Sequence, residues 1–541
     1  MNYLKQLLAI SVSAVMLFGC SSKSSKNDTT NNTDTTANDS QTGEQTADQR
    51  TLPVLSIETV SKDPDVMDFV NTPVSRHVAE SIASWTPGYK IPPEPYYEDC
   101  TVTLTDSSGK VLLSPSEAQV KVRGNWTTTY AKKPLKIKFT EKQNMLGLNN
   151  GAEQKNWLLL AEYKDASMLR NKAALYASRE IMKDDGLYAA DSDLVSVEIN
   201  GEYYGIYLLT EMQQISSARV NIAEPDSVYT GADTGYFLEY DGYFYNEDEL
   251  HQFPLDFADN SPLIPYDGKN ENEGSYVRPL AMSKNDPKEK VGITIKSKIN
   301  SQEQHDFIAN FVNNTYRIMY EAAYNDKAFV FDKDFRNITE SKDITPQQAV
   351  ENVVDIDSLV DIYIISELTC DADIYWSSFY MDADFSADGK KKLTFEAPWD
   401  FDSAMGNKDR CIDGTGFYAS NLVPDVNGGT KGGGEYDTIN PWLVVLAHED
   451  WYQDMIKEKW TKVYDDGVFD RTLKLIESDS TELEDEFRNN YNKWNNILMN
   501  SDFVKELSEP ANSCINELQA AEFLRSWLQS RIDFLNSQWH K

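Results

Sequence analysis

The sequence predicts an α+β protein in which a β-rich part, residues 51–300, precedes a mainly helical part, residues 301–541. Before residue 300, short segments alternate between apolar and polar residues and are separated by turn residues, as antiparallel strands are. After residue 300, apolar residues recur at helical spacing in four long segments: 307–324, 357–368, 441–464 and 523–539. These patterns predict two lobes, an antiparallel β-rich N-terminal lobe and a mainly helical C-terminal lobe.

The β-rich lobe is expected to open with a strand at residues 52–57 and a hairpin that turns at residues 107–110. Asp165 or Ser167 is in position to cap one helix, which runs to about residue 181. A second hairpin turns at Asn200-Gly201, a dipeptide typical of two-residue hairpin loops. Further strands are predicted at residues 156–161 and 236–240, and the Asp-, Asn-, Pro- and Gly-rich residues 244–298 predict an inserted loop or lid.

Two neighbouring strand patterns carry cations on one face. Apolar residues in the segments 118–124 and 132–139 alternate with Lys121, Arg123, Lys136 and Lys138. Because successive strand residues point to opposite faces, these cations share the face away from the core. The face is a candidate for phosphate binding, and the alternatives are a solvated strand surface or, for Arg123, burial against an acid.

The first 50 residues predict export and tethering. Lys5 and the apolar residues 7–18 predict a signal peptide at residues 1–19, too short to span a bilayer. It ends in Leu17-Phe18-Gly19-Cys20, which resembles a bacterial lipobox and predicts lipidation of Cys20; the alternative is an ordinary secretory signal with an incidental cysteine. Residues 20–50 are small or polar and predict a disordered tether. We expect an extracytoplasmic protein held on a bacterial membrane by its lipid anchor alone.

Composition excludes several classes of function. A formal net charge of −36 argues against nucleic acid as a partner, since both would be anionic. The four cysteines beyond Cys20 are too far apart for a paired zinc motif, and the five histidines are scattered. No serine-hydrolase or zinc-protease motif occurs. The chemistry is therefore expected to rest on carboxylates, in a chain that we expect to be monomeric.

The clearest chemical pattern is Trp399-Asp400-Phe401-Asp402, which follows the apolar, strand-like residues 393–398. Two carboxylates at this spacing suit a hard divalent cation such as Mg²⁺ beside substrate phosphates. A second acidic pair, Asp371 and Asp373, lies just upstream. An acid, a strand and then a metal-type acid is the order that a phosphoryl-transfer site uses. The alternative is that these carboxylates only cap backbone amides.

Seven short motifs follow one another along the chain: Arg123-Gly124-Asn125, Lys132-Lys133-Pro134, Lys155-Asn156-Trp157, Arg170-Asn171-Lys172, Asn200-Gly201-Glu202-Tyr203, Gly205 to Glu211 and Trp399 to Asp402. This ordered set resembles the spore coat protein H (CotH) kinase family over about residues 52–539. The resemblance implies an atypical, protein-kinase-like fold. It also implies an enzyme that uses ATP with Mg²⁺ or Mn²⁺ to phosphorylate Ser or Thr of secreted proteins.

The resemblance implies roles for the acids. Asp400 matches the metal-binding aspartate, and Asp402 is either a second metal ligand or a structural hydrogen-bond acceptor. Asp373 matches the catalytic aspartate that orients and deprotonates the attacking hydroxyl. Asp371 is its rival, because a slip by two residues keeps the same strand face. Ser378 stands where kinase catalytic loops place an asparagine for a second metal ion.

The resemblance also implies a nucleotide site. Arg123, Lys136 and Lys138 are the candidate phosphate-binding residues, with Lys138 as the lysine of the phosphate-binding strand and Glu180 as its helical partner. Arg170 is a further candidate, from the first turn of the predicted helix. Backbone groups near Glu211 are expected to bind the adenine edge, with a structural hydrogen bond as the alternative for this glutamate. No Gly-rich phosphate loop occurs in the sequence.

Two functions follow as hypotheses. The first is an extracytoplasmic kinase that transfers the ATP γ-phosphoryl group to Ser or Thr of secreted or surface proteins. The second is a catalytically weak or inactive kinase-like surface protein that acts as an adhesin or scaffold, which Ser378 and the scarcity of ATP outside cells favour. A third, a calcium-stabilised glycan-binding lipoprotein, has less support, because the Asp-rich residues 233–259 lack the spacing of an EF-hand.

Overall fold

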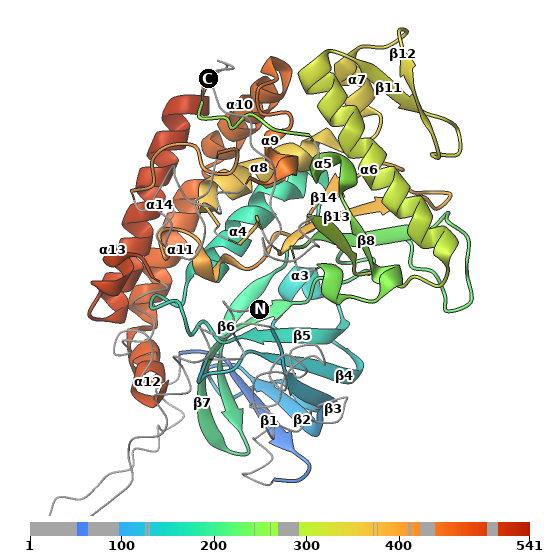
Figure 1. The fold of residues 1–541 in the computed structure, drawn as a ribbon. Helices are drawn as coiled ribbons and strands as arrows, with labels where there is room; N and C mark the ends of the chain where they lie inside the picture. The colour runs from blue at the N-terminus through green and yellow to red at the C-terminus, as the bar shows by residue number, and fades with distance from the viewer. Residues whose placement is uncertain are drawn as a thin grey trace, which may run out of the picture.

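The computed structural model describes residues 51–62, 97–124, 127, 130–242, 244–259, 261–268, 291–371, 373–375, 377–408, 413–421, 439–494 and 507–541. The chain is α+β, as expected: a β-barrel built from the first seven strands adjoins a mainly helical part (Figure 1). The predicted signal peptide, Cys20 and the tether lie outside the described residues. Among the described helices, none is both long and apolar enough to cross a membrane.

Seven strands close into the barrel in the order β1-β2-β3-β4-β5-β7-β6. Their bounds are β1 (Val54–Thr59), β2 (Glu98–Thr105), β3 (Val111–Val122), β4 (Leu135–Gln143), β5 (Gln154–Leu160), β6 (Ser192–Ile199) and β7 (Glu202–Glu211). All neighbouring pairs are antiparallel except β1 and β6, which are parallel and close the barrel. The sequence predicted the strands and not this closure, because β1 and β6 lie far apart along the chain.

The barrel strands separate two hydrophobic cores. Trp157 and Leu159 of β5 point into the barrel core, whereas Leu158 and Leu160 belong to the core shared with the helices. Successive residues of a strand face opposite sides, so a strand buried on both faces is apolar throughout. This explains the unbroken apolar run at residues 157–161. The outer face of the barrel is thereby fixed against the helical part.

The turn predictions are confirmed. Asn200 and Gly201 connect β6 to β7 with φ of 52° and 80°, the left-handed values that a tight hairpin turn of this kind requires. The hairpin of β2 and β3 turns over residues 106–110, where the Asp106 carboxylate accepts hydrogen bonds from the amides of Ser108 and Lys110. Local residue chemistry thus sets both reversals of the chain.

The described helices differ widely in length. The longer helices are α4 (Arg170–Met182), α6 (Gln302–Asn325), α8 (Ile356–Thr369), α10 (Asp450–Asp465), α11 (Val468–Glu482), α12 (Glu484–Trp494) and α14 (Glu517–Trp539). The shorter ones are α3 (Leu148–Gly151), α5 (Asp256–Asp259), α7 (Pro346–Glu351), α9 (Pro441–Val444) and α13 (Glu509–Asn512). The single helix predicted at 441–464 is in fact two, α9 and α10, because the chain leaves helical geometry between Val444 and Asp450.

A second sheet joins strands from both sides of the boundary predicted at residue 300. Its order is β14-β13-β8-β10-β9, with β8 (Gly235–Tyr240), β9 (Gln252–Pro254), β10 (Gly292–Ile295), β13 (Phe379–Asp384) and β14 (Thr394–Phe395). A separate hairpin pairs β11 (Ala328–Phe331) with β12 (Ile338–Ser341). The predicted insertion at 244–298 therefore contributes two strands to this sheet within its described residues, which a simple loop would not do.

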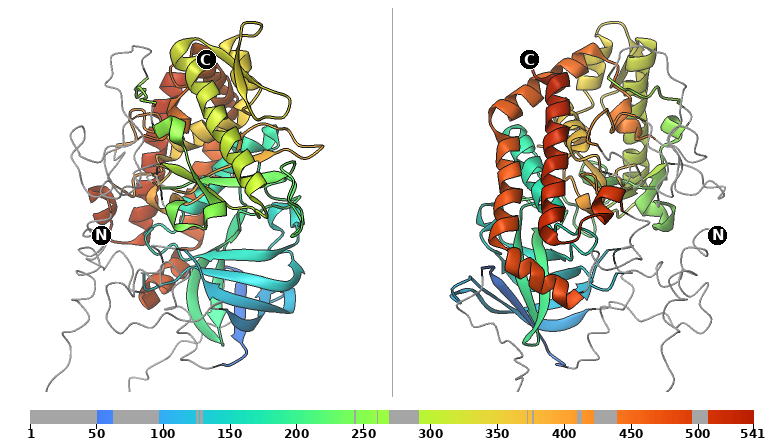
Figure 2. Two further views of the ribbon diagram at one scale, coloured as in Figure 1. Left: turned by 45° about the vertical axis from the view of Figure 1, so that its right-hand side comes forward. Right: turned by 90° about the vertical axis from the view of Figure 1, so that its left-hand side faces the viewer.

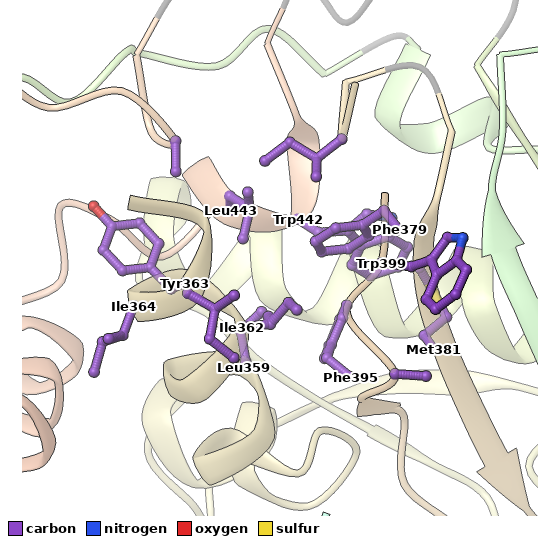
Figure 3. Packing of buried hydrophobic residues seen from close by; sticks show 14 of the residues in the cluster. Leu359, Ile362, Tyr363, Ile364, Phe379, Met381, Phe395, Trp399, Trp442 and Leu443 are labelled. Atoms are coloured by element: carbon purple, nitrogen blue, oxygen red, sulfur yellow. The ribbon is translucent and has the colours of Figure 1, made fainter. Parts of the chain in front are cut away.

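Helix α8 is buried on every side and leads directly into the acidic residues. Leu359 and Ile362 of α8 pack with Phe395 of β14 and Phe379 of β13 (Figure 3). The same cluster includes Trp399, which is 4 % exposed. A helix that is buried on all sides forms the centre of its domain. The two acidic segments consequently start from one rigid apolar platform.

Helix α12 fastens the helical part to the outer face of the barrel (Figure 2). The Asn490 side chain accepts a hydrogen bond from the Ile206 amide at 3.1 Å, and the Trp494 indole donates to the Tyr204 carbonyl at 2.7 Å. Gly205 lies between these contacts at φ 130°, and a side chain there would collide with both Trp494 and Asn490. The glycine of this motif is therefore required by the approach of the helix.

Candidate active site

Asp400 lies in a tight, strained turn that follows β14. Ala397 and Asp400 both have positive φ, 63° and 73°, which is unusual for residues with a side chain. The turn is held by two hydrogen bonds: the Ala397 amide donates to the Tyr188 carbonyl at 2.8 Å, and the Phe401 amide donates to the Asn171 side chain at 2.8 Å. Backbone strain of this kind persists where surrounding contacts enforce it, and it concentrates at functional sites.

Asp400 sits among other carboxylates. Burial raises the pKa of Asp400 to about 7, and the Asp402 and Asp373 carboxylates add to the rise, while Arg123 and Lys164 oppose it. The Ser378 hydroxyl donates to Asp400 Oδ2 at 3.4 Å. Several acids that make each other harder to ionise form the kind of site that a bound cation stabilises.

Asp371 and Asp373 follow the end of α8, where Cys370 adopts a left-handed conformation that turns the chain. Asp371 is fully buried; its Oδ1 accepts a hydrogen bond from the Asp373 amide at 3.1 Å, and within the described residues Oδ2 has no hydrogen-bond partner. Burial, and then the Asp373 charge, raise the pKa of Asp371 well above its usual range. Asp373 is a quarter exposed and lies 3.6 Å from Lys408. Of the two acids, Asp373 is the one that a substrate is able to approach.

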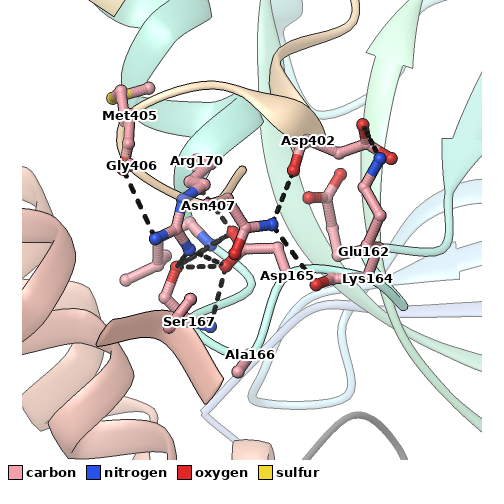
Figure 4. A network of polar contacts seen from close by, with 12 residues as sticks. Glu162, Lys164, Asp165, Ala166, Ser167, Arg170, Asp402, Met405, Gly406 and Asn407 are labelled. Atoms are coloured by element: carbon pink, nitrogen blue, oxygen red, sulfur yellow. Dashed lines mark hydrogen bonds and ion pairs between the residues drawn. The ribbon is translucent and has the colours of Figure 1, made fainter. Parts of the chain in front are cut away.

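Asp402 is held by the segment that joins the barrel to α4. The Lys164 ammonium lies 2.9 Å from Asp402 Oδ1 and also donates to the Ser403 hydroxyl at 2.6 Å. The Asn407 side chain donates to the Asp402 carbonyl at 2.7 Å (Figure 4). The carboxylates of Asp402 and Asp373 raise the pKa of Lys164 well above its usual range, in spite of burial, which acts in the opposite direction. Asp402 therefore has a structural cation as its partner.

Glu162 and Asn171 support the same motif from behind. The Asn171 amide group donates to both carboxylate oxygens of Glu162, at 3.0 and 3.2 Å, while its carbonyl accepts from Phe401. Burial, with a smaller contribution from Asp165, raises the pKa of Glu162 well above its usual range. Local sequence patterns do not predict Lys164, Glu162 or Asn171 as residues of the site. The motif Arg170-Asn171-Lys172 and the polar residues directly after β5 were the available signals.

The cationic face of β3 and β4 forms as predicted. Lys121 of β3 is the Cα partner of Lys136 of β4 in the barrel register. Burial, together with the charges of Lys121, Lys138 and Arg123, lowers the pKa of Lys136 to about 8. Lys138 is exposed, with its ammonium 6.0 Å from the centre of the Tyr97 ring. These cations repel one another, so an anion bound between them would be stabilised.

Arg123 links this cationic face to the acids. Its guanidinium lies 5.8 Å from the centre of the Trp399 ring, and its charge opposes the rise in the pKa of Asp400. Arg123 also lowers the pKa of Lys136, so it is close to both groups. The outer face of the barrel and the Asp400 turn thus adjoin each other.

Arg170 and Glu180 have other partners than the sequence-based expectation gave them, whereas the Glu211 side chain forms a structural contact. Arg170 is 1 % exposed and forms a buried ion pair with Asp165, which corrects the prediction that its side chain reaches a phosphate (Figure 4). Glu211 is fully buried and pairs with Arg219 at 3.0 Å, which is the structural alternative named for it. Glu180 contacts Arg471 at 2.8 Å rather than a lysine of β4. The sequence placed these charges on the correct elements but did not identify their partners.

The acids fit a metal ion only in combination with other ligands. In the described part of the chain, no three carboxylate, imidazole or thiolate side chains converge closely enough to hold a metal ion. Asp400, with the Ser378 hydroxyl beside it, supplies the hard oxygen donors that Mg²⁺ or Mn²⁺ prefers. Mg²⁺ commonly keeps waters and binds through one or two carboxylates plus substrate phosphates. The donor set suits a cation that arrives with a nucleotide.

Comparisons with known proteins identify the family. No curated protein matches the chain. A family model described as CotH kinase protein matches residues 120–535, which include the cations of the β3–β4 face, the Asn171 motif and all four acids. The chain therefore belongs to the CotH kinase family.

Proposed function

We propose that this protein is an extracytoplasmic atypical kinase that transfers the γ-phosphoryl group of ATP to Ser or Thr of secreted or surface proteins. The observation that carries the proposal is the position of Arg123, whose guanidinium lies over Trp399 while its charge acts on both Lys136 and Asp400. A site for ATP needs cations for the phosphates beside acids for a divalent ion, and these two groups adjoin here.

In this proposal each side chain has a distinct task. Arg123, Lys136 and Lys138 bind the phosphates and neutralise the charge that develops during transfer. Asp400 is the principal metal ligand, and a bound Mg²⁺ or Mn²⁺ would supply charge stabilisation on the phosphates. Asp373 orients the substrate hydroxyl and accepts its proton as the hydroxyl oxygen bonds to the γ-phosphorus. The bond from that phosphorus to the β,γ-bridging oxygen breaks, and ADP leaves.

The proposal extends to fold and location. The barrel and the helical part correspond to the two lobes of an atypical kinase fold, with Asp371 and Asp373 after α8 and Asp400 after β14. Lipidation of Cys20 and the tether up to residue 50 would hold a monomer near a bacterial membrane, where it would meet secreted protein substrates. The formal charge of −36 favours solubility there and disfavours nucleic acid as a partner.

A second candidate function is an inactive kinase-like adhesin or scaffold. The observation that favours it is Ser378, which contacts Asp400 at 3.4 Å in the place where kinases use asparagine. A hydroxyl is a weaker metal ligand than an amide carbonyl. Serine at this position would therefore weaken binding of a second metal ion and lower kinase activity. Such a scaffold would not need Asp373 or Asp400 for binding its partner.

Titration calorimetry of ATP with Mg²⁺ or Mn²⁺ into the full chain tests the proposal. We expect micromolar binding that the Asp400→Asn variant loses and that Asp388→Asn, an exposed turn residue of the β13–β14 hairpin, retains. Transfer of labelled phosphate to a Ser- and Thr-rich protein mixture then tests the chemistry. Absence of nucleotide binding with either metal would reject the kinase and leave the scaffold.

A further inference from the structure

Lys164 is anchored inside the acidic motif by both its side chain and its backbone. Its ammonium contacts Asp402 Oδ1 at 2.9 Å and the Ser403 hydroxyl at 2.6 Å, and its side chain is 5 % exposed. The Asn407 side chain donates to the Lys164 carbonyl at 3.4 Å and to the Asp402 carbonyl at 2.7 Å (Figure 4). Lysine carries up to three donors on a flexible stem, so these contacts fix one geometry.

The position of this ammonium within the chain is also fixed. Lys164 lies between β5 of the barrel and α4, and a neighbouring residue of the same segment, Asp165, forms the buried pair with Arg170. Glu162, on the other side, is held by Asn171. A charged group that is removed from water is tolerated only where it is paired and hydrogen-bonded. Asp402 provides that pairing, so Lys164 and Asp402 form a built-in cation–carboxylate unit.

The contacts of Asp400 and Asp373 differ from those of Asp402. In the part of the chain that the structure describes, Asp400 has no ion pair with a lysine or arginine, and its contact is the Ser378 hydroxyl. Asp373 has Lys408 at 3.6 Å, but both side chains are more than a fifth exposed, and exposed pairs rearrange at little cost. Asp402, by contrast, forms an ion pair with the buried Lys164.

Kinases that use two metal ions bind the first through an aspartate and the second through an asparagine of the catalytic loop. Here Ser378 replaces that asparagine and Lys164 occupies a position against Asp402. A divalent ion brought against the same carboxylate would face a fixed positive charge a few ångströms away, which opposes its binding.

We infer that the Lys164 ammonium takes the place of a second metal ion, so that the site binds one divalent cation, at Asp400. The inference rests on the proposed function, because it specifies the metal content of that same site. It makes Lys164 a positioning residue: it holds Asp402 and supplies a permanent positive charge beside the phosphates. The enzyme then depends on metal concentration through one ion only.

Metal counting tests the inference without relying on activity. The full chain is dialysed to equilibrium against Mn²⁺ and a non-hydrolysable ATP analogue, and bound manganese is counted per bound nucleotide; electron paramagnetic resonance then distinguishes isolated from coupled ions. We expect one isolated Mn²⁺ in the unaltered protein and in Lys164→Arg, which keeps the charge. We expect a second, weaker Mn²⁺ and a coupled pair in Lys164→Met, which keeps the volume and removes the charge.

The outcomes of this experiment distinguish failure of the one-metal inference from failure of the kinase proposal. A coupled manganese pair in the unaltered protein overturns the inference and leaves the kinase proposal intact. Absence of manganese and nucleotide binding in the unaltered protein overturns the kinase proposal and the inference with it. A Lys164→Met variant that is folded by circular dichroism and still holds one ion also counts against the inference. Where that variant does not fold, the count in the unaltered protein decides alone.

Discussion

Asn171 holds the Phe401 amide at 2.8 Å with its side-chain carbonyl and the Glu162 carboxylate with its side-chain amide. One residue at the start of α4 therefore positions the backbone between Asp400 and Asp402. Because both partners are buried, these hydrogen bonds fix the geometry of the Asp400 turn. The orientation of Asp400 depends on a helix that precedes it by more than 200 residues along the chain.

Replacing Asn171 is expected to lower both the stability of the fold and the rate of catalysis. Asn171→Ala leaves two buried polar groups without partners, which costs about 1–3 kcal/mol for each. The Asp400 turn would relax, so we expect kcat to fall at least tenfold while KM for ATP changes less. Thermal unfolding and steady-state kinetics measure the two effects. Asn310→Ala, which removes partly buried hydrogen bonds from α6 to the carbonyls of residues 335 and 336, is the control outside the site and should lower stability alone.

Asp373 and Asp371 are expected to have different roles, one in catalysis and the other in stability. Asp373→Ala should lower kcat by about 10²–10⁴, the usual contribution of a general base, and leave binding of the metal–nucleotide complex nearly unchanged. Asp371→Asn should instead alter stability, because the fully buried Asp371 carboxylate accepts from the Asp373 backbone. Kinetics and unfolding of both variants provide the measurement. Full turnover in Asp373→Ala would indicate that Asp371 acts as the base instead of Asp373.

Lys136 is expected to act on nucleotide affinity. Lys136→Ala removes a cation that has three others around it, so the phosphates would lose one charge-assisted contact, worth about 1.5–3 kcal/mol. We expect KM for ATP to rise about tenfold or more, with a smaller change in kcat. Lys142→Ala, at an exposed position of the same strand, is the control and should leave KM unaltered. An equal effect of both variants would show that Lys136 contributes only to the general surface charge and does not contact the phosphates.

The buried pair Asp382 and Glu396 predicts a pH-dependent stability outside the site. Burial raises the pKa of Glu396 to about 7 from 4.5, so the folded state keeps a proton that the unfolded state releases. The stabilisation is complete below pH 4.5 and is lost as the pH rises through 7. Over this range it amounts to about 3 kcal/mol at most.

Urea unfolding at pH 5 and pH 8 measures this term. Glu396→Gln removes the titrating group and keeps an acceptor for the Tyr188 amide, which donates to Glu396 at 2.6 Å. We expect the unaltered protein to lose more stability than the variant between these two pH values. Parallel curves for the two proteins would show that Glu396 does not hold a proton in the folded state.

The sequence predicted the features whose causes are local. The Asn200-Gly201 turn, the cationic alternation around Lys136 and the strand before Asp400 each depend on residues within a short window. The structure contains features that the sequence did not predict where interacting residues are far apart along the chain. Lys164 reaches Ser403 across 239 positions and Asn171 reaches Phe401 across 230, and no local pattern announces such pairs.

Arg170 illustrates the intermediate case. Its place in the first turn of a helix suggested a phosphate ligand, yet its partner is Asp165, only five residues earlier. That aspartate had been recognised as a possible helix cap, and its carboxylate does accept hydrogen bonds from the Leu169 and Arg170 amides. One acid therefore satisfies both the helix end and the arginine, and a count of local donors and acceptors would have indicated this.

The contact between Ile206 and Asn490 has a consequence for the order in which the protein matures. These residues lie 284 positions apart, and synthesis proceeds from the N-terminus, so the barrel is made long before the helix that covers its outer face. The Ile206 amide and the surface around Gly205 stay uncovered until α12 has been synthesised. The outer face of the barrel is therefore completed only after α12 has been made, whatever the order in which the barrel strands pair.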